Sequence, residues 1–114
     1  MKAIMVKPDD MVNVEEVGGY KDLVDYFDGF PEIVYPRLLS KPFCMLVDDI
    51  GLHRNLRING FGSKLYGTDR LGNPIVGDIF IMKQAWGSDG FNLAGLTDNE
   101  IDGLINKYSL NLGK

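Results

Sequence analysis

The residues most able to do chemistry are gathered in one stretch, from Gly51 to Pro74, which we call the basic segment. It has four lysines and arginines against one acid, whereas the whole chain carries a net charge of −4. Guanidinium and ammonium groups pair strongly with phosphates, and backbone N–H groups in glycine-rich sequence can form an anion-binding nest, here within Asn59–Lys64. The segment therefore predicts a site for a small anionic ligand, bound by His53, Arg54, Arg57, Asn59, Lys64 and Arg70.

Three aromatic residues could form the walls of such a site. Phe61 and Tyr66 lie in the basic segment, and Trp86 lies in a second glycine-rich segment that we expect to be a loop. A nucleotide base or an arginine can stack on aromatic rings, which makes a nucleotide the predicted ligand. Each of these rings could equally pack against the core or an interface.

Two other interpretations of the basic segment stay open. It could consist of tight turns at Asn59-Gly60 and Gly72-Asn73, with its arginines solvated or paired to the acidic N-terminal third of the chain. It could also bind an acidic protein partner. Charge complementarity between the basic segment and the acidic third further predicts a homo-oligomer, because a two-fold axis lets each subunit supply both surfaces.

A familiar catalytic set is not recognisable in the sequence. Acyl transfer needs a nucleophile, a base and an orienting group, and Cys44 with His53 is the only such pair. Cys44 lies in a strand-like apolar run, where a cysteine is usually inert. His53 has no second histidine, and Asp48 with Asp49 supplies too few metal ligands. We predict a non-enzymatic protein without cofactor, metal or catalytic residue; a metal-dependent phosphate-ester hydrolase using His53 and Asp48 is an alternative.

The elements that must position these residues follow from periodicity and turn signals. Apolar residues recur with helical spacing over 20–27, and Thr97 with Glu100 has the spacing of a capping box that begins a second helix. An acidic, turn-rich connection is expected before residue 20, and Gly77-Asp78 predicts a bulge. We expect one α+β domain over residues 1–114, a mostly antiparallel sheet of four to five strands with two helices packed against it. The predicted strands cover residues 2–7, 32–39, 42–50 and 75–84.

Composition limits the classes of function. The chain has 114 residues and one cysteine, so an intrachain disulfide is excluded and the cytoplasm is the expected compartment. No run of apolar residues is long enough for a membrane span. Because the net charge is negative, we expect neither general nucleic-acid binding nor attachment to an anionic membrane.

Several short sequence motifs in the chain resemble those of a known family. They are FCMLVDDIG, LRINGFGSKLYG, IVGDIFI and LTDNEI, at residues 43–51, 56–67, 75–81 and 96–101. With the short N-terminal strand, they resemble small phage and mobile-element proteins grouped as domain of unknown function number 3846. The resemblance spans most of the chain, and the family's label names no activity. Its phage setting implies an accessory protein in the host cytoplasm that sequesters a defence signal or, alternatively, modulates a host enzyme.

Overall fold

The fold is a six-stranded antiparallel sheet with helices on both faces. The computed structural model describes residues 1–51, 54–67, 74–87 and 90–110, without the side chains of residues 86, 87, 90 and 91. This confirms the expected α+β class; within the described residues the sheet is larger than predicted and there is one helix more. The strands are β1 (Lys2–Val6), β2 (Val12–Glu16), β3 (Pro31–Val34), β4 (Phe43–Asp48), β5 (Ile79–Gly87) and β6 (Gly90–Ala94), and the described helices are α1 (Tyr20–Phe27), α2 (Gly60–Tyr66) and α4 (Asp98–Tyr108).

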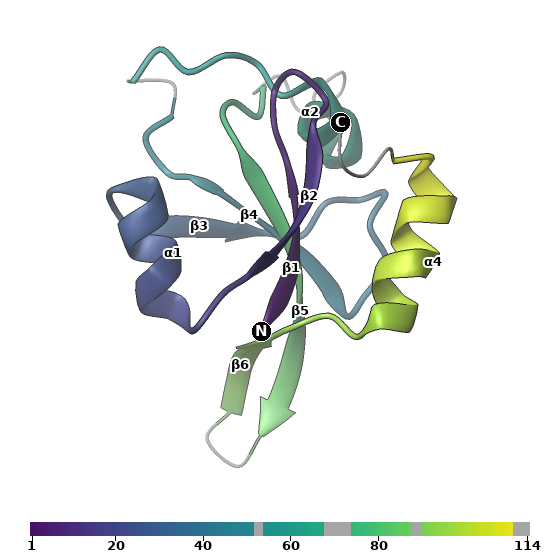
Figure 1. The fold of residues 1–114 in the computed structure, drawn as a ribbon. Coiled ribbons are helices and arrows are strands. Elements are labelled where there is room, and N and C mark those ends of the chain that lie inside the picture. Colours follow the sequence, from purple (N-terminus) through teal and green to yellow (C-terminus); the bar gives the residue numbers. More distant parts are fainter. Residues whose placement is uncertain (52–53, 68–73, 88–89, 111–114) are drawn as a thin grey trace.

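The strands are arranged around β5, the longest of them. The order is β2-β1-β5-β4-β3, and β6 also pairs with β5 (Figure 1). Lys83 of β5 lies opposite Phe43 of β4 on one side and Ala94 of β6 on the other, so β6 continues the edge of β5 that β1 occupies. The predicted run over 32–39 forms an edge strand and ends before Pro36, as its proline indicates.

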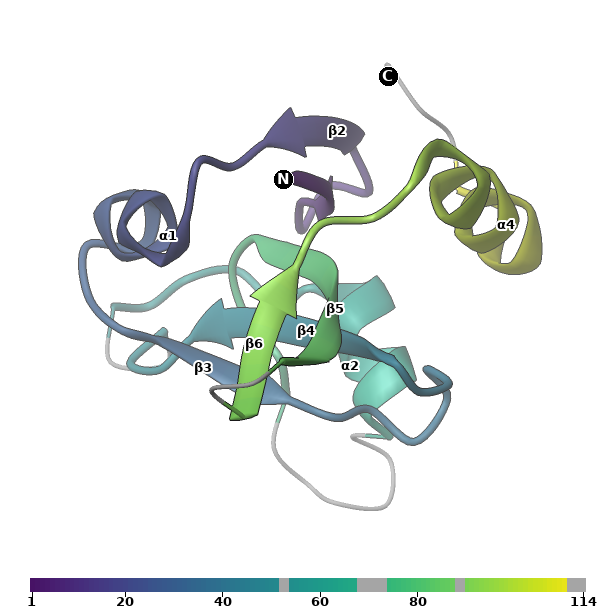
Figure 2. The same ribbon diagram turned by 90° about the horizontal axis from the view of Figure 1, so that it is seen from below.

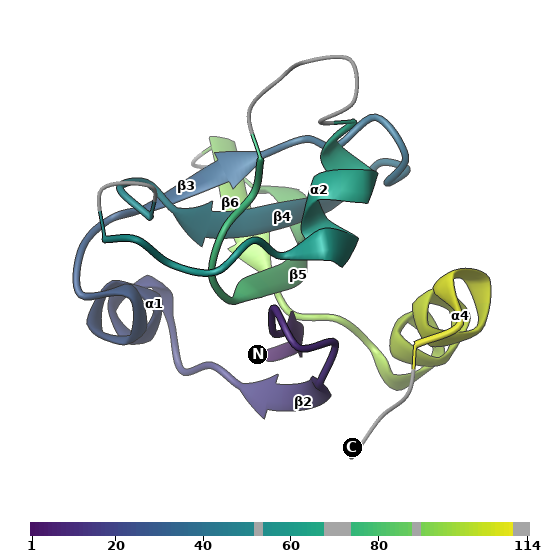
Figure 3. The same cartoon turned by 90° about the horizontal axis from the view of Figure 1, so that it is seen from above.

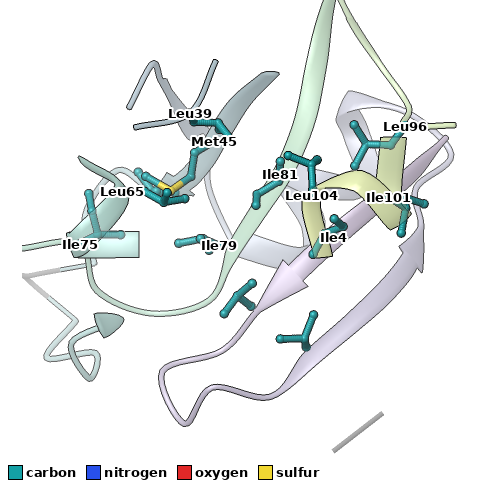
Figure 4. Packing of buried hydrophobic residues seen from close by; sticks show 13 residues of the cluster. Ile4, Leu39, Met45, Leu65, Ile75, Ile79, Ile81, Leu96, Ile101 and Leu104 are labelled. Carbon is teal, nitrogen blue, oxygen red and sulfur yellow. The ribbon is translucent and has the colours of Figure 1, made fainter. Parts of the chain in front are cut away.

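Alternation along β5 divides the core into two layers. Ile79 and Ile81 point to the face covered by α2 and α4, whereas Phe80 and Met82 point to the face covered by α1. Figures 2 and 3 show α1 and α4 on opposite sides of the strands. Figure 4 shows the first layer, in which Leu65 of α2 and side chains of α4 meet the strand residues.

The two predicted helices form where the sequence places them. α1 has the predicted bounds, and its residues Leu23 and Phe27 are buried. At the start of α4, the Thr97 side chain accepts a hydrogen bond from the Glu100 N–H over 3.1 Å, and the Glu100 carboxylate accepts one from the Thr97 N–H over 2.8 Å. The capping box is therefore confirmed.

Two segments predicted as loops or turns are strands. The acidic connection before α1 contains β2, whose residue Val12 is buried and which, among the described strands, pairs with β1 alone. The second glycine-rich segment, which holds Trp86, forms the end of β5 and all of β6. Both strands are stabilised by pairing with a neighbouring strand. Their short, charged or glycine-rich sequences have little strand propensity of their own, so the sequence does not indicate this pairing.

The expectations for the basic segment and the following strand also need correction. The basic segment contains α2, although glycine disfavours a helix interior. The strand predicted over 75–84 begins only at Ile79, without the predicted bulge, because Gly77 has a φ of +77° and turns the chain. Residues 75–77 pair with residues 57–59 instead.

Candidate functional site

Asn59 fixes the geometry of the basic segment from inside the protein. Its side chain is fully buried, and its Oδ1 accepts a hydrogen bond from the Gly62 N–H over 2.9 Å as the N-cap of α2. Its Nδ2 donates to the carbonyl oxygens of Val6 and Gly77 over 2.9 and 2.8 Å. Asn59 thus joins β1, α2 and the segment before β5, and its polar side-chain atoms are engaged within the fold.

The predicted anion nest is the first turn of α2. The Gly62 N–H is bound by the Asn59 side chain and the Ser63 N–H by the Asn59 carbonyl oxygen, so these two donors serve the helix. Asn59-Gly60, taken in one interpretation as a tight turn, is this helix start. The second turn of that interpretation, Gly72-Asn73, lies outside the described residues.

A short antiparallel ladder positions Arg57. The Asn59 N–H donates to the Ile75 carbonyl oxygen and the Gly77 N–H to the Arg57 carbonyl oxygen, each over 2.8 Å. This pairing brings Arg57 next to Gly77, which is twenty positions away in the sequence, and to Asp78, which follows it. The Arg57 side chain itself is exposed and makes no ion pair with the described residues.

Arg54 has a different role, because its guanidinium lies between two aspartates. Nη2 donates to the carbonyl oxygen of Asp28 over 2.8 Å, and Nη1 lies 3.6 Å from the Asp28 carboxylate. Nε lies 3.2 Å from Oδ2 of Asp48, an ion-pair contact without hydrogen-bond alignment. The interpretation in which an arginine pairs with the acidic N-terminal third is thus confirmed for Arg54. Arg54 ties the end of α1 to the end of β4.

A cleft of about 470 Å³ lies between α1 and these segments; we call it the Arg57 cleft. Its described wall contains two guanidinium groups and three carboxylates, beside aromatic and aliphatic surface. Such a wall can pair with an anionic group and also accept hydrogen bonds from a ligand. The residues that line it include Tyr26, Asp28, Arg54, Leu56, Arg57 and Asp78.

Tyr26 and Asp78 form a contact at this wall that the sequence analysis missed. The Tyr26 hydroxyl donates a short hydrogen bond to Oδ2 of Asp78 and also contacts the sulfur of Met5. Burial, and then the bond to Asp78, raises the pKa of Tyr26 well above its ordinary value of 10.0, so the phenol keeps its proton further into the alkaline range than a free tyrosine does. One signal was available: Tyr26 is an aromatic residue on α1 outside its apolar stripe.

The remaining predicted ligand residues of the described part lie elsewhere. Lys64, Phe61 and Tyr66 are on α2, and none of them lines the Arg57 cleft. Phe61 packs edge-on against Tyr108, and both Phe61 and Tyr66 contact the core. Tyr66 also borders a second cavity, of about 300 Å³, whose described wall includes Glu32, Asp48 and Asp49 and no cation, so its charge disfavours an anion.

Three predicted residues are not placed by the structure. His53 and Arg70 lie outside the described residues, as does the side chain of Trp86. Among the described side chains, no group of three histidines, cysteines or acids could hold a metal ion. Cys44 is fully buried in β4, and burial raises the pKa of its thiol to about 11.

Comparison with known proteins identifies one match. The family model described as a domain of unknown function, DUF3846, matches residues 1–109. Comparisons with curated proteins and with solved structures find no significant match. Among the described helices, none is long and apolar enough to cross a membrane.

Proposed function

Because the chain belongs to the family described as a domain of unknown function, DUF3846, which names no activity, we propose its function from the Arg57 cleft. The protein binds a small anionic ligand of the nucleotide class there, without converting it. One observation carries the proposal: exposed Arg57 borders the same 470 Å³ space as the half-exposed ring of Tyr26. Ligand pockets commonly have volumes between about 300 and 1,000 Å³.

The chemistry of the wall suits the two ends of a nucleotide. A guanidinium pairs with phosphate through two parallel hydrogen bonds. Arg57 can make this pair because it has no ion pair with the described residues that would compete with the phosphate. Tyr26, which is 47% exposed, and Leu56, which is 37% exposed, line the cleft and offer apolar surface to a flat base. Arg54, engaged by Asp28 and Asp48, holds the wall in shape.

Two measurements test the proposal. Native mass spectrometry of protein purified from cells should show an adduct with the mass of a nucleotide. Thermal shift with mono-, di- and cyclic nucleotides should show stabilisation, amounting to about 2.7 kcal/mol when the ligand is at 100 times its dissociation constant. Arg57→Ala should abolish the shift, and Lys64→Ala, which removes an exposed cation outside the cleft, should keep it. An absence of both adduct and shift across the panel overturns the proposal.

We place this activity, as part of the proposal, in a phage-type accessory protein acting in the host cytoplasm. Sequestration of a defence signal needs tight binding and no chemistry, which suits a wall of fixed charges. Its test is restoration of a nucleotide-signalled defence response when Arg57→Ala replaces the wild-type chain during infection. The homo-oligomer expected from charge complementarity is tested by sedimentation of the wild type against Arg57→Glu.

A second candidate, a protein-interaction module that modulates a host enzyme, is favoured by exposed apolar surface near the same arginines. Ile50, Leu56 and Ile58 are 45%, 37% and 61% exposed. Apolar side chains beside charges are typical of protein interfaces. Ile58→Ser separates the two functions: it should weaken a protein complex and leave the thermal shift with nucleotides unchanged, because Ile58 does not line the cleft.

A further inference from the structure

We infer that the Arg57 cleft selects nucleotides that carry a single phosphate group and an amino group on the base, and that it discriminates against di- and triphosphates. The inference rests on the proposed function and gives it a ligand class. Of the two guanidinium groups in the described wall, Arg54 is engaged and Arg57 makes no ion pair with the described residues, and Asp78 has one carboxylate oxygen without a hydrogen bond to the described chain.

Positive charge is scarce in the described wall of the Arg57 cleft. The cleft has two guanidinium groups in its described wall, but Arg54 already contacts the Asp28 carbonyl oxygen and lies 3.2 Å from the Asp48 carboxylate. Arg57 is exposed and has no ion pair in the described chain. One guanidinium matches one phosphate group, so the wall holds one such group well.

The carboxylates of the cleft disfavour further phosphate groups. The side chain of Asp28 is 92% exposed. Asp78 follows Gly77, whose N–H donates to the Arg57 carbonyl oxygen. Both aspartates line the cleft and place negative charge there. A β- or γ-phosphate in the cleft would bring further negative charge to a wall that already carries these carboxylates, and charges closer than the screening distance of about 8 Å at physiological ionic strength repel one another strongly. Repulsion therefore grows with each added phosphate, and the described wall has no further cation to offset it.

Asp78 also favours a hydrogen-bond donor on the ligand. Its Oδ2 accepts the Tyr26 hydroxyl, and its Oδ1 makes no hydrogen bond to the described chain. A carboxylate oxygen only accepts hydrogen bonds, so it pairs with an exocyclic amino group and repels a carbonyl oxygen at the same place. Sites that bind a donor reject analogues lacking it far more strongly than apolar pockets reject a missing methyl group.

Asp48 does not contribute to this selection, although it also lines the cleft. Its Oδ1 accepts the Ile50 N–H over 3.0 Å, its Oδ2 faces Arg54, and its side chain is only 8% exposed. Asp78 therefore selects the base, and Asp28 together with Asp78 opposes added phosphates.

Isothermal titration calorimetry of the wild-type chain with AMP, cyclic AMP, ADP, ATP and IMP is the test. We expect AMP or cyclic AMP to bind at least tenfold more tightly than ATP, with ADP between them, and AMP at least tenfold more tightly than IMP. Asp28→Asn should reduce the preference for AMP over ATP severalfold, and Asp78→Asn should reduce the preference for AMP over IMP. Circular dichroism checks that each variant is folded.

The outcomes separate the two proposals. Binding of ATP as tight as that of AMP, or of IMP as tight as that of AMP, overturns the selection and leaves the binding function standing. Absence of binding by all five compounds overturns both. The affinities of the wild-type chain for the five nucleotides are sufficient to test the inference, even if a variant fails to fold.

Discussion

Arg54 donates a hydrogen bond to the carbonyl oxygen of Asp28 over 2.8 Å, from a residue 26 positions further along the chain. Asp28 has a left-handed conformation, with a φ of 53°, and ends α1. A cation at the C-terminal end of a helix meets the negative end of its dipole. The contact therefore fastens α1 to the same wall that presents Arg57.

Arg54→Ala should destabilise the fold by about 1–3 kcal/mol, because it leaves the Asp48 carboxylate, which is only 8% exposed, without its cation. Arg57→Ala removes an exposed guanidinium and should change the free energy of unfolding by no more than about 0.5 kcal/mol. Urea denaturation of the two variants measures both values. Equal losses would contradict the distinction drawn between these arginines.

Asn59→Ala should cost about 2–4 kcal/mol, since it removes the N-cap of α2 and the donor to two carbonyl oxygens. Asn59→Asp keeps the cap oxygen and still loses the donor, so it should be destabilised as well. Chemical denaturation measures these changes. Asn99→Ala, at an exposed position of α4, is the matched control and should stay within about 0.5 kcal/mol of wild type. A mild effect of Asn59→Ala would mean that α2 forms without its cap.

Stability should depend on pH through Glu100. The hydrogen bond from Lys83 over 2.7 Å, and then that from the Thr97 N–H, lowers the pKa of Glu100 below its ordinary value of 4.5. A lowered pKa means that the contribution is fully present above about 4.5 and is lost as the pH falls through the folded-state value. The difference in unfolding free energy between wild type and Lys83→Met should therefore shrink in acid. A difference that stays constant from pH 7 to pH 3 would contradict the pairing.

Cys44 should react with thiol reagents only when the protein opens. It is fully buried, and burial raises its pKa to about 11, so little thiolate forms near neutral pH. Labelling with an excess of a maleimide at pH 7 should be slow for the native chain and fast in urea. Rapid labelling of the native chain would show that β4 opens locally.

Local sequence signals predicted the elements whose stability is largely local. The stripe of α1 and the Thr97–Glu100 box of α4 were readable because each lies within a few residues. α2 was not readable, because its sequence has two glycines and it depends on Asn59 and on burial of Leu65. β2 and β6 depend on pairing with strands elsewhere.

The candidate site was only half predictable for the same reason. Charge alone located Arg54 and Arg57, but it could not show that Asp28 and Asp48 engage Arg54. It also grouped Lys64 with them, although a helix carries Lys64 away from the cleft. The partners Tyr26 and Asp78 are 52 positions apart, and only the folded sheet brings them together.

The place of β5 at the centre of the sheet has a consequence for how the chain reaches its fold. β1 pairs with β5 through Ile4 and Ile81, and β4 pairs with β5 through Met45 and the same Ile81. During synthesis, most of the chain must therefore leave the ribosome before β5 is available to pair with the β1-β2 hairpin or the β3-β4 hairpin. Contacts so distant in sequence slow folding, and the waiting hairpins expose apolar edges that recruit chaperones or aggregate.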